Sequence, residues 1–271
     1  VTLTPGLNAT VKDALGTVRT YTAATIAGIT RNTGVTAPCS GCDAATYAYD
    51  VNGFVQARTD FNGNRTNYTR DRRGLESRRV EGLTNLGAAA GVSRTISTEW
   101  HADYRLPTRI AEPYRITTFI YGAANDGNPG NRGSVLSKTI QATSDATGSA
   151  GVTAPVIGTP RTWTYTYDAN GQVLTVDGPR TDVSDVTTYT YYPNNIICRG
   201  SNVTGCRGQV ASVTNALGHV STIDEYNAHG QPLRLTDPNG LVTTLSYDAR
   251  MRVTSRTVGT ESTAYTYDAA G

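Results

Sequence analysis

The four cysteines have the clearest potential for chemistry, and they form two local pairs. Two residues separate Cys39 from Cys42, and seven separate Cys198 from Cys206. Zinc would need both pairs together, because each pair offers only two ligands and no histidine stands at ligand spacing. In a secreted protein we expect disulfides Cys39–Cys42 and Cys198–Cys206 instead, the second worth roughly 2–3 kcal/mol by loop closure. The first pair also has the spacing of thioredoxin-like redox sites, although no helix start is indicated there.

No other combination of side chains predicts catalysis. His101, His219 and His229 occupy turn positions, and no nucleophile motif accompanies them. Aspartates that might serve as acids or bases recur at one position of a repeated pattern. Because an active site is singular, this recurrence favours a role in turns. We therefore expect no catalytic residue, no metal site and no cofactor.

These residues belong to a repeated strand–turn–strand unit, which is clearest in the stretch WTYTYDANGQVL. Trp163, Tyr165 and Tyr167 alternate with threonines, so an extended chain would place the three rings on one face. Asp168 would open a tight turn with its carboxylate, and Gly171 would supply the left-handed backbone that closes it. The unit therefore predicts a β-hairpin.

The unit recurs with a period close to 21 residues. Tyr226 and Tyr247 are 21 residues apart, and Tyr247 and Tyr267 are 20 apart. A second D-x-x-G turn falls between successive anchors, so one repeat is two strands and two turns. The expected aromatic anchors are Tyr49, Trp100, Tyr121, Tyr167, Tyr191, Tyr226, Tyr247 and Tyr267. The expected turn residues are Asp50, Gly53, Asp71, Gly74, Asp168, Gly171, Asp237, Gly240, Asp248 and Asp268.

The pattern Y-x-Y-D-x-x-G at this period resembles the YD repeat of Rhs and related bacterial toxin proteins. The resemblance extends over about residues 11–271. It implies an all-β fold of tandem antiparallel hairpins that form a long curved or spiralling sheet. In YD-repeat proteins such a sheet encloses a C-terminal toxin. The resemblance therefore implies a structural shell segment of a large secreted or surface bacterial protein, with the C-terminal toxin or another part of the same polypeptide as its partner.

One segment of the array also resembles the motif that ends Rhs cores. Residues 232–241 fit P-x4-D-P-x-G-L, and in the family that region belongs to an aspartyl self-cleaving domain. Ordinary repeats continue past this segment, and Asp237 with Gly240 already matches the second turn of the repeat. We therefore expect a turn here rather than self-cleavage.

A period near 20 residues indicates one continuous array over residues 1–271, whose units contact only their neighbours. We expect regular repeats at about 47–80, 95–141, 161–192 and 208–271. Loops or linkers are expected at about 82–94, 122–134, 143–160 and 193–207. The sequence ends within the turn of a hairpin, so we expect a fragment of a larger chain.

Composition narrows the choice of partner. A net charge of +2 gives no reason to expect nucleic acid or an anionic membrane. No stretch approaches the ~20 apolar residues of a membrane-spanning helix. Hydrophobic residues make up 38% of the chain, below the roughly 45–50% usual in globular domains. The 16 tyrosines against 3 phenylalanines favour a broad sheet with one partly wet face.

Seven arginines between Arg58 and Arg79 leave two interpretations open. They form a solvated sheet face with cross-strand ion pairs, or they bind an anionic partner such as acidic cargo or a polysaccharide. The main alternative to a shell is an extracellular adhesin or filament-forming surface protein. Such a protein would bind carbohydrate through exposed aromatic rings or self-associate through its sheet edges. An enzyme has the least support.

Overall fold

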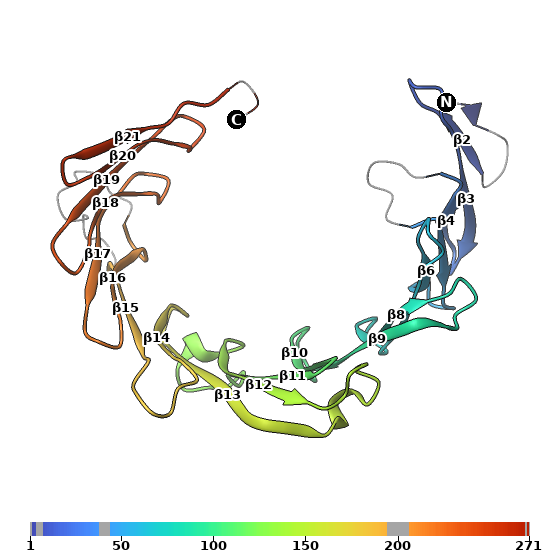
Figure 1. Cartoon of the computed structure of the whole chain (residues 1–271), viewed down its shortest axis with the longest axis horizontal. Coiled ribbons are helices and arrows are strands. Elements are labelled where there is room, and N and C mark those ends of the chain that lie inside the picture. The colour runs from blue at the N-terminus through green and yellow to red at the C-terminus, as the bar shows by residue number, and fades with distance from the viewer. Residues whose placement is uncertain (1, 4–7, 38–43, 194–205, 269, 271) are drawn as a thin grey trace. The chain divides into compact units, whose positions relative to one another are not determined.

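The computed structural model describes residues 2–3, 8–37, 44–193, 206–268 and 270. Within these ranges the chain is almost entirely β-strand, with 21 strands and two single-turn 3-10 helices. Most strands pair antiparallel with their neighbours in sequence, and short turns join many of these pairs (Figure 1). The predicted all-β fold of tandem antiparallel hairpins is confirmed.

The chain divides into two compact units. Unit 1 contains residues 1–119 and 139–160, and unit 2 contains residues 120–138 and 161–271. Three strands contribute residues to both units, namely β11 (Arg115–Tyr121), β12 (Val135–Thr143) and β13 (Val156–Tyr167).

In unit 1 each strand from β1 to β10 pairs with the next one along the chain. These strands are β1 (Thr2–Leu3), β2 (Ala9–Lys12), β3 (Val18–Ile26), β4 (Ile29–Val35), β5 (Thr46–Tyr49), β6 (Val55–Thr59), β7 (Arg65–Arg70), β8 (Glu76–Leu83), β9 (Ala89–Trp100) and β10 (Pro107–Glu112). Tight turns with glycine or a short polar residue separate most of them, which keeps sequence neighbours adjacent in the sheet.

Unit 2 continues the same arrangement from β13 onward. Its further strands are β14 (Val173–Asp177), β15 (Thr187–Tyr191), β16 (Val210–Thr214), β17 (Val220–Tyr226), β18 (Pro232–Thr236), β19 (Val242–Tyr247), β20 (Val253–Val258) and β21 (Glu261–Ala264). Aromatic and β-branched residues dominate them, as expected for a pleated surface.

The two faces of the sheet in unit 2 differ in chemistry. Registers place Tyr165 opposite Val176 and Ile223 opposite Leu235 on one face. On the other face hydroxyl groups stand side by side, as between Thr166 and Thr175 at 2.7 Å. Similar contacts join Thr190 to Ser212 and Ser246 to Ser255, both at 2.7 Å. Because a strand alternates its side chains, the period-two pattern of the sequence produces one apolar and aromatic face and one hydroxyl face.

Neither unit has a large hydrophobic core among the described residues. In unit 1, Ala111, Ile116 and Ala154 form a small buried cluster, with Val152 packed against it. Two of these residues belong to the segment between β12 and β13, which contains the 3-10 helix η2 (Gly151–Thr153) and packs on β9 and β10. Stability therefore comes mainly from contacts between neighbouring strands, as in other repeat proteins.

The expected loop at 82–94 is wrong. Strand β8 continues to Leu83 and β9 begins at Ala89, so only a tight turn separates them. Thr84 makes that turn, because its hydroxyl accepts a hydrogen bond from the Ala88 N–H at 3.2 Å, and Gly87 has a φ of 86°. A threonine in place of aspartate hid the D-x-x-G pattern.

The expected loop at 143–160 extends too far at its C-terminal end, because β13 already begins at Val156. The segment 122–134 lacks strands and contains the 3-10 helix η1 (Pro129–Asn131). Of the segment 193–207, residues 194–205 lie outside the described ranges. No helix among the described residues is long and apolar enough to cross a membrane.

Candidate functional site

The tight turns of the repeats begin with a short side chain that accepts hydrogen bonds from backbone N–H groups further along the turn. Asp168 Oδ1 accepts from the N–H groups of Asn170 at 2.8 Å and Gln172 at 2.9 Å. The Gly171 N–H also donates to the Asp168 carbonyl at 3.1 Å. Gly171 has a φ of 84°, which glycine adopts without a steric penalty. These contacts give Asp168 a role in forming the turn.

The same two bonds, to N–H groups two and four residues ahead, recur in both kinds of turn. They are made by Asp13, Asp50, Asp60, Asp71, Asp168, Asn215, Asn227, Asp237 and Asp248. Asp268 makes the first of them, to the Ala270 N–H at 2.9 Å. The third residue after each is a glycine with φ between 77° and 86°, namely Gly16, Gly53, Gly63, Gly74, Gly171, Gly218, Gly230 and Gly240. After Asp248 this position is Met251, with a φ of 63°.

These hydrogen bonds favour the ionised carboxylates. For Asp168, burial alone would raise the pKa, but the N–H groups of Gln172 and Asn170 outweigh it and hold the pKa below its ordinary value. For Asp248, the Arg252 N–H is the largest cause of a lowered pKa. A lowered pKa makes these groups poor general acids or bases near neutral pH.

A second recurring contact joins each anchor to the repeat before it. The Tyr247 hydroxyl donates to the carbonyl of Pro232 at 2.9 Å. Pro232 is itself the cross-strand partner of Tyr226, beside a shift in the register of β17 and β18. Tyr247 therefore binds the strand that its predecessor Tyr226 has paired with, and the hydrogen bond crosses from one repeat to the next.

The same relationship holds along both units. The donor–acceptor pairs are Tyr49 to Asn32 (2.6 Å), Tyr167 to Val135 (2.7 Å), Tyr191 to Val173 (2.7 Å), Tyr226 to Val210 (2.8 Å) and Tyr267 to Val253 (2.7 Å). In unit 2 the acceptors Val173, Val210 and Val253 pair in turn with Tyr167, Tyr191 and Tyr247. Tyr121 ends β11 just before Gly122, and burial raises its pKa.

Two other donors replace tyrosine in unit 1. Trp100 Nε1 donates to the Glu76 carbonyl at 2.8 Å. Arg70 Nε makes a long contact of 3.5 Å with the Val55 carbonyl. Val55 pairs with Tyr49, and Glu76 with Arg70. The repeat pattern does not reveal Arg70 as an anchor, because the pattern is defined by aromatic rings, whereas the position requires a side-chain donor.

Buried tyrosine hydroxyls of this kind resist ionisation. Tyr226 is 4% exposed, and burial, assisted by the neighbouring Tyr192, raises its pKa to about 12. Burial also raises the pKa values of Tyr167, Tyr191 and Tyr247. The neutral phenol is therefore the form that donates to the carbonyl.

The turns that directly follow the anchor positions lie at one end of the strands, which we call the anchor edge. Successive turns at this edge also touch one another. A methyl group on Gly74 would lie 2.5 Å from Cζ of Phe54, which follows the preceding turn. At equivalent places, Gln231 Nε2 donates to the Met251 carbonyl and Gln172 Nε2 to the Gly208 carbonyl, at 2.8 and 2.7 Å.

The opposite edge is different. No atom lies within 4 Å of a methyl group built on Gly63, Gly218 or Gly240. The two edges of the sheet therefore carry the same turn chemistry with different packing.

Only some of the expected sites of chemistry fall within the described residues. Cys39, Cys42 and Cys198 fall outside the described residues, while Cys206 is disulfide-bonded and 1% exposed. Asp237 caps a turn, accepting from the Asn239 and Leu241 N–H groups at 2.9 and 2.8 Å. In the part of the chain that the structure describes, no cluster of three His, Cys, Asp or Glu side chains is arranged to hold a metal ion.

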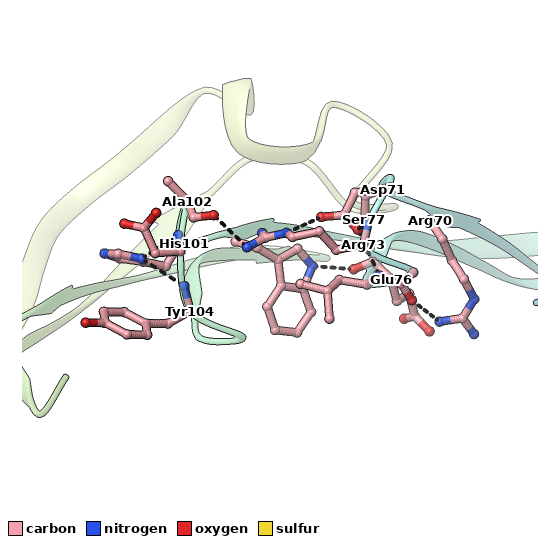
Figure 2. Close-up of polar contacts among 12 residues, drawn as sticks. Arg70, Asp71, Arg73, Glu76, Ser77, His101, Ala102 and Tyr104 are labelled. Carbon is pink, nitrogen blue, oxygen red and sulfur yellow. Dashed lines mark hydrogen bonds and ion pairs between the residues drawn. The ribbon is translucent and has the colours of Figure 1, made fainter.

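The arginine-rich segment from Arg58 to Arg79 contains several ion pairs. Arg79 lies 2.9 Å from Glu81 and 3.6 Å from Glu76, and Arg73 lies 3.2 Å from Asp71. Arg73 Nη1 also donates to the Ala102 carbonyl at 2.8 Å, which ties one turn to the next (Figure 2). These contacts favour the interpretation as a solvated face with ion pairs.

Sequence reasoning missed one singular carboxylate. Asp224 is 8% exposed, and among the described residues it is the buried carboxylate. The hydroxyls of Thr222 and Thr236 donate to it at 2.8 and 2.5 Å, and Arg234 Nε lies 3.5 Å away. An extra residue in β17 shifts the register here, so these contacts hold β17 and β18 in place. The only sign of this extra residue in the sequence is that the segment T-I-D-E-Y in β17 is one residue longer than the equivalent T-L-S-Y in β19.

Comparison with known proteins places part of the array in a family. The RHS Repeat family model matches residues 226–261, which run from the end of β17 to the start of β21. No curated protein matches the sequence.

Solved structures share the fold over almost the whole chain. TcdB2-TccC3 without its hypervariable C-terminal region has a TM-score of 0.55 at 16% identity, covering 97% of this chain and 14% of that one. TcdB2-TccC3-Cdc42 has a TM-score of 0.54 at 16% identity, covering 94% and 14%. A Tc holotoxin pore from Photorhabdus luminescens has a TM-score of 0.49 at 17% identity, covering 96% and 14%. The chain thus spans about one seventh of these proteins. Residues 226–261 thus match the RHS repeat, and the resemblance to Rhs-type YD-repeat proteins that the sequence predicts is confirmed.

Proposed function

We propose that this chain is a wall segment of an Rhs-like shell in a large secreted or surface bacterial protein. The shell encloses the C-terminal toxin or another part of the same polypeptide. The carrying observation is the anchor hydrogen bond from each repeat to the strand of the repeat before it, as from Tyr247 to Pro232. Such links strengthen a wall that has little hydrophobic core to stabilise it.

The two faces of the sheet suit this role. In unit 2, Val213, Ile223, Leu235 and Leu245 line an apolar groove of about 460 Å³. An enclosed polypeptide that is not fully folded exposes apolar side chains, and these would be buried against such a face. We assign the apolar and aromatic face to the cargo and the hydroxyl face to water.

The segment itself is proposed to be non-catalytic. For Asp237 a catalytic role in self-cleavage competes with the role in the turn, because Asp237 lies in the P-x4-D-P-x-G-L segment. Its Oδ1 is already occupied by the N–H groups of Asn239 and Leu241. The purified protein should therefore stay uncut near Leu241, and Asp237→Ala should change stability only. Cleavage at that point in the natural chain, lost in a folded Asp237→Ala variant, would show that Asp237 is catalytic.

Protection of the downstream polypeptide tests the shell. The full open reading frame would be expressed and digested with proteinase K, with the downstream polypeptide expressed alone as control. We expect the downstream segment to survive within the full chain and to be degraded when alone. The double variant Tyr226→Ala and Tyr247→Ala, which removes two links, should lose protection, whereas Tyr165→Ala should lose less. Equal digestion in all cases, together with glycan binding through surface aromatics, would favour the adhesin instead.

A further inference from the structure

One turn of unit 1 is capped by a histidine, where the other capped turns described above use aspartate, asparagine or threonine. His101 Nδ1 accepts from the N–H groups of Asp103 at 3.1 Å and Tyr104 at 3.2 Å. Because a backbone N–H can only donate, Nδ1 must be unprotonated, and the ring hydrogen must lie on Nε2. The cap therefore exists only in the neutral imidazole.

The backbone of this turn also differs from the others. The His101 N–H donates to the Leu106 carbonyl at 2.8 Å, five residues ahead, whereas the Asp168 N–H reaches Gln172 four residues ahead. No residue from 102 to 106 has a positive φ. The longer turn thus lacks the positive-φ residue that closes the turns described above and relies more on its capping side chain.

Charged groups surround this turn on two elements (Figure 2). On the preceding turn, Arg73 donates to the carbonyl of Ala102 and pairs with Asp71. On its own turn, Asp103 and Arg105 follow, both exposed, and the Tyr104 ring lies 4.8 Å from the imidazole.

A proton on Nδ1 would be directed at two N–H groups, and the cation would sit one residue from the carbonyl that holds the Arg73 guanidinium. Both effects work against the closed turn.

We propose that the His101 turn is an acid-sensitive joint in the array. Protonation of Nδ1 removes the acceptor for the Asp103 and Tyr104 N–H groups, opens the turn, and releases the Arg73–Ala102 link to the preceding turn. Imidazole changes charge in the range between pH 5 and 8, where carboxylates and amides remain acceptors. Mild acid would therefore act on this turn and leave the turns capped by aspartate and asparagine closed. The inference is independent of the shell assignment.

Hydrogen exchange measured by mass spectrometry on the full chain tests the joint. Exchange in the peptide covering residues 100–107 would be compared at about pH 7.5 and 5.5, after correction for the intrinsic effect of pH on exchange. We expect opening to increase about tenfold at the lower pH, which corresponds to the loss of one or two net hydrogen bonds. The turn of Asp168 provides an internal reference and should not change.

Three variants decide the cause. His101→Asp and His101→Asn each supply an acceptor used elsewhere in the array, so both should fold and both should abolish the pH response. His229→Asn is the matched control, because His229 lies in a turn capped by Asn227 and contributes only its backbone N–H to the cap. Absence of a response in the natural chain, its persistence in both His101 variants, or its loss in His229→Asn would each overturn the proposal.

Discussion

The ring of Phe54 lies so close over Gly74 that a methyl group on the glycine would be 2.5 Å from Cζ of the ring. Phe54 follows one turn of the anchor edge and Gly74 closes the next, so this contact joins successive repeats. On the opposite edge, Gly63 has a φ of 84° and nothing within 4 Å of the same methyl position. Comparing Gly74 with Gly63 therefore separates the effect of backbone conformation from the effect of packing.

Gly74→Ala should therefore destabilise the protein more than Gly63→Ala. Both substitutions put alanine at positive φ, which costs roughly 1–2 kcal/mol, and only the first also forces Phe54 aside, for roughly 1–3 kcal/mol more. Urea denaturation followed by tyrosine fluorescence would measure the difference. Equal losses would mean that the turns do not support one another.

Tyr247→Phe should lower the free energy of unfolding by about 0.5–1.5 kcal/mol, because the Pro232 carbonyl loses its donor. Tyr165→Phe is the control, since none of the hydrogen bonds described for the chain involves its hydroxyl. It should change stability by less than about 0.5 kcal/mol. If both variants behave alike under urea, the anchor hydrogen bond contributes nothing specific.

Stability should fall in strong alkali through Tyr226. Its pKa is raised to about 12 in the fold, against about 10 in an unfolded chain. The folded state therefore holds the proton more tightly. This contribution is complete below about pH 10 and is lost as the pH rises through about 12.

Comparing urea midpoints of the natural chain and Tyr226→Phe across this range checks the sign. The natural chain should lose stability more steeply than the variant, and parallel curves would contradict the assignment to Tyr226.

Met251→Gly should stabilise the protein by about 0.5–1 kcal/mol, because Met251 occupies the glycine position of its turn with a φ of 63°. The residue is 52% exposed, so little packing is lost. Met251→Ala keeps the Cβ atom and should bring no gain. A lower melting temperature for the glycine variant would show that the methionine side chain contributes through contacts instead.

The hairpins were predictable because turn chemistry is local. Asp168 and Gly171 are three residues apart, and their roles depend on backbone atoms within the same turn. Thr84 shows where this reasoning stops, because it caps its turn with a hydroxyl and the D-x-x-G pattern does not reveal it. His101 was expected in a turn, but the pattern did not show that its ring nitrogen is the cap. What the position requires is an acceptor atom, which several residue types supply.

Contacts between repeats were harder to predict from the sequence. The spacing identified Tyr247 as an anchor, but only the register of β18 shows that its hydroxyl meets the carbonyl of Pro232. Arg70 replaces an aromatic anchor as a donor, and Phe54 meets Gly74 only when two turns lie side by side. These relationships depend on how strands are staggered, which a short sequence pattern does not encode.

The anchor hydrogen bonds all point backward along the chain, from a later tyrosine to an earlier carbonyl. During synthesis, a hairpin that has just left the ribosome thus presents an acceptor whose donor has not yet emerged. The last hairpin to emerge always lacks the hydroxyl donor for its free carbonyl. The next anchor tyrosine supplies this donor, so the hairpins are completed in the order in which they are synthesised. Proteolysis of nascent chains stalled at successive lengths should show each hairpin becoming resistant only after the following anchor emerges. Resistance that appears as soon as a hairpin is complete would contradict this order.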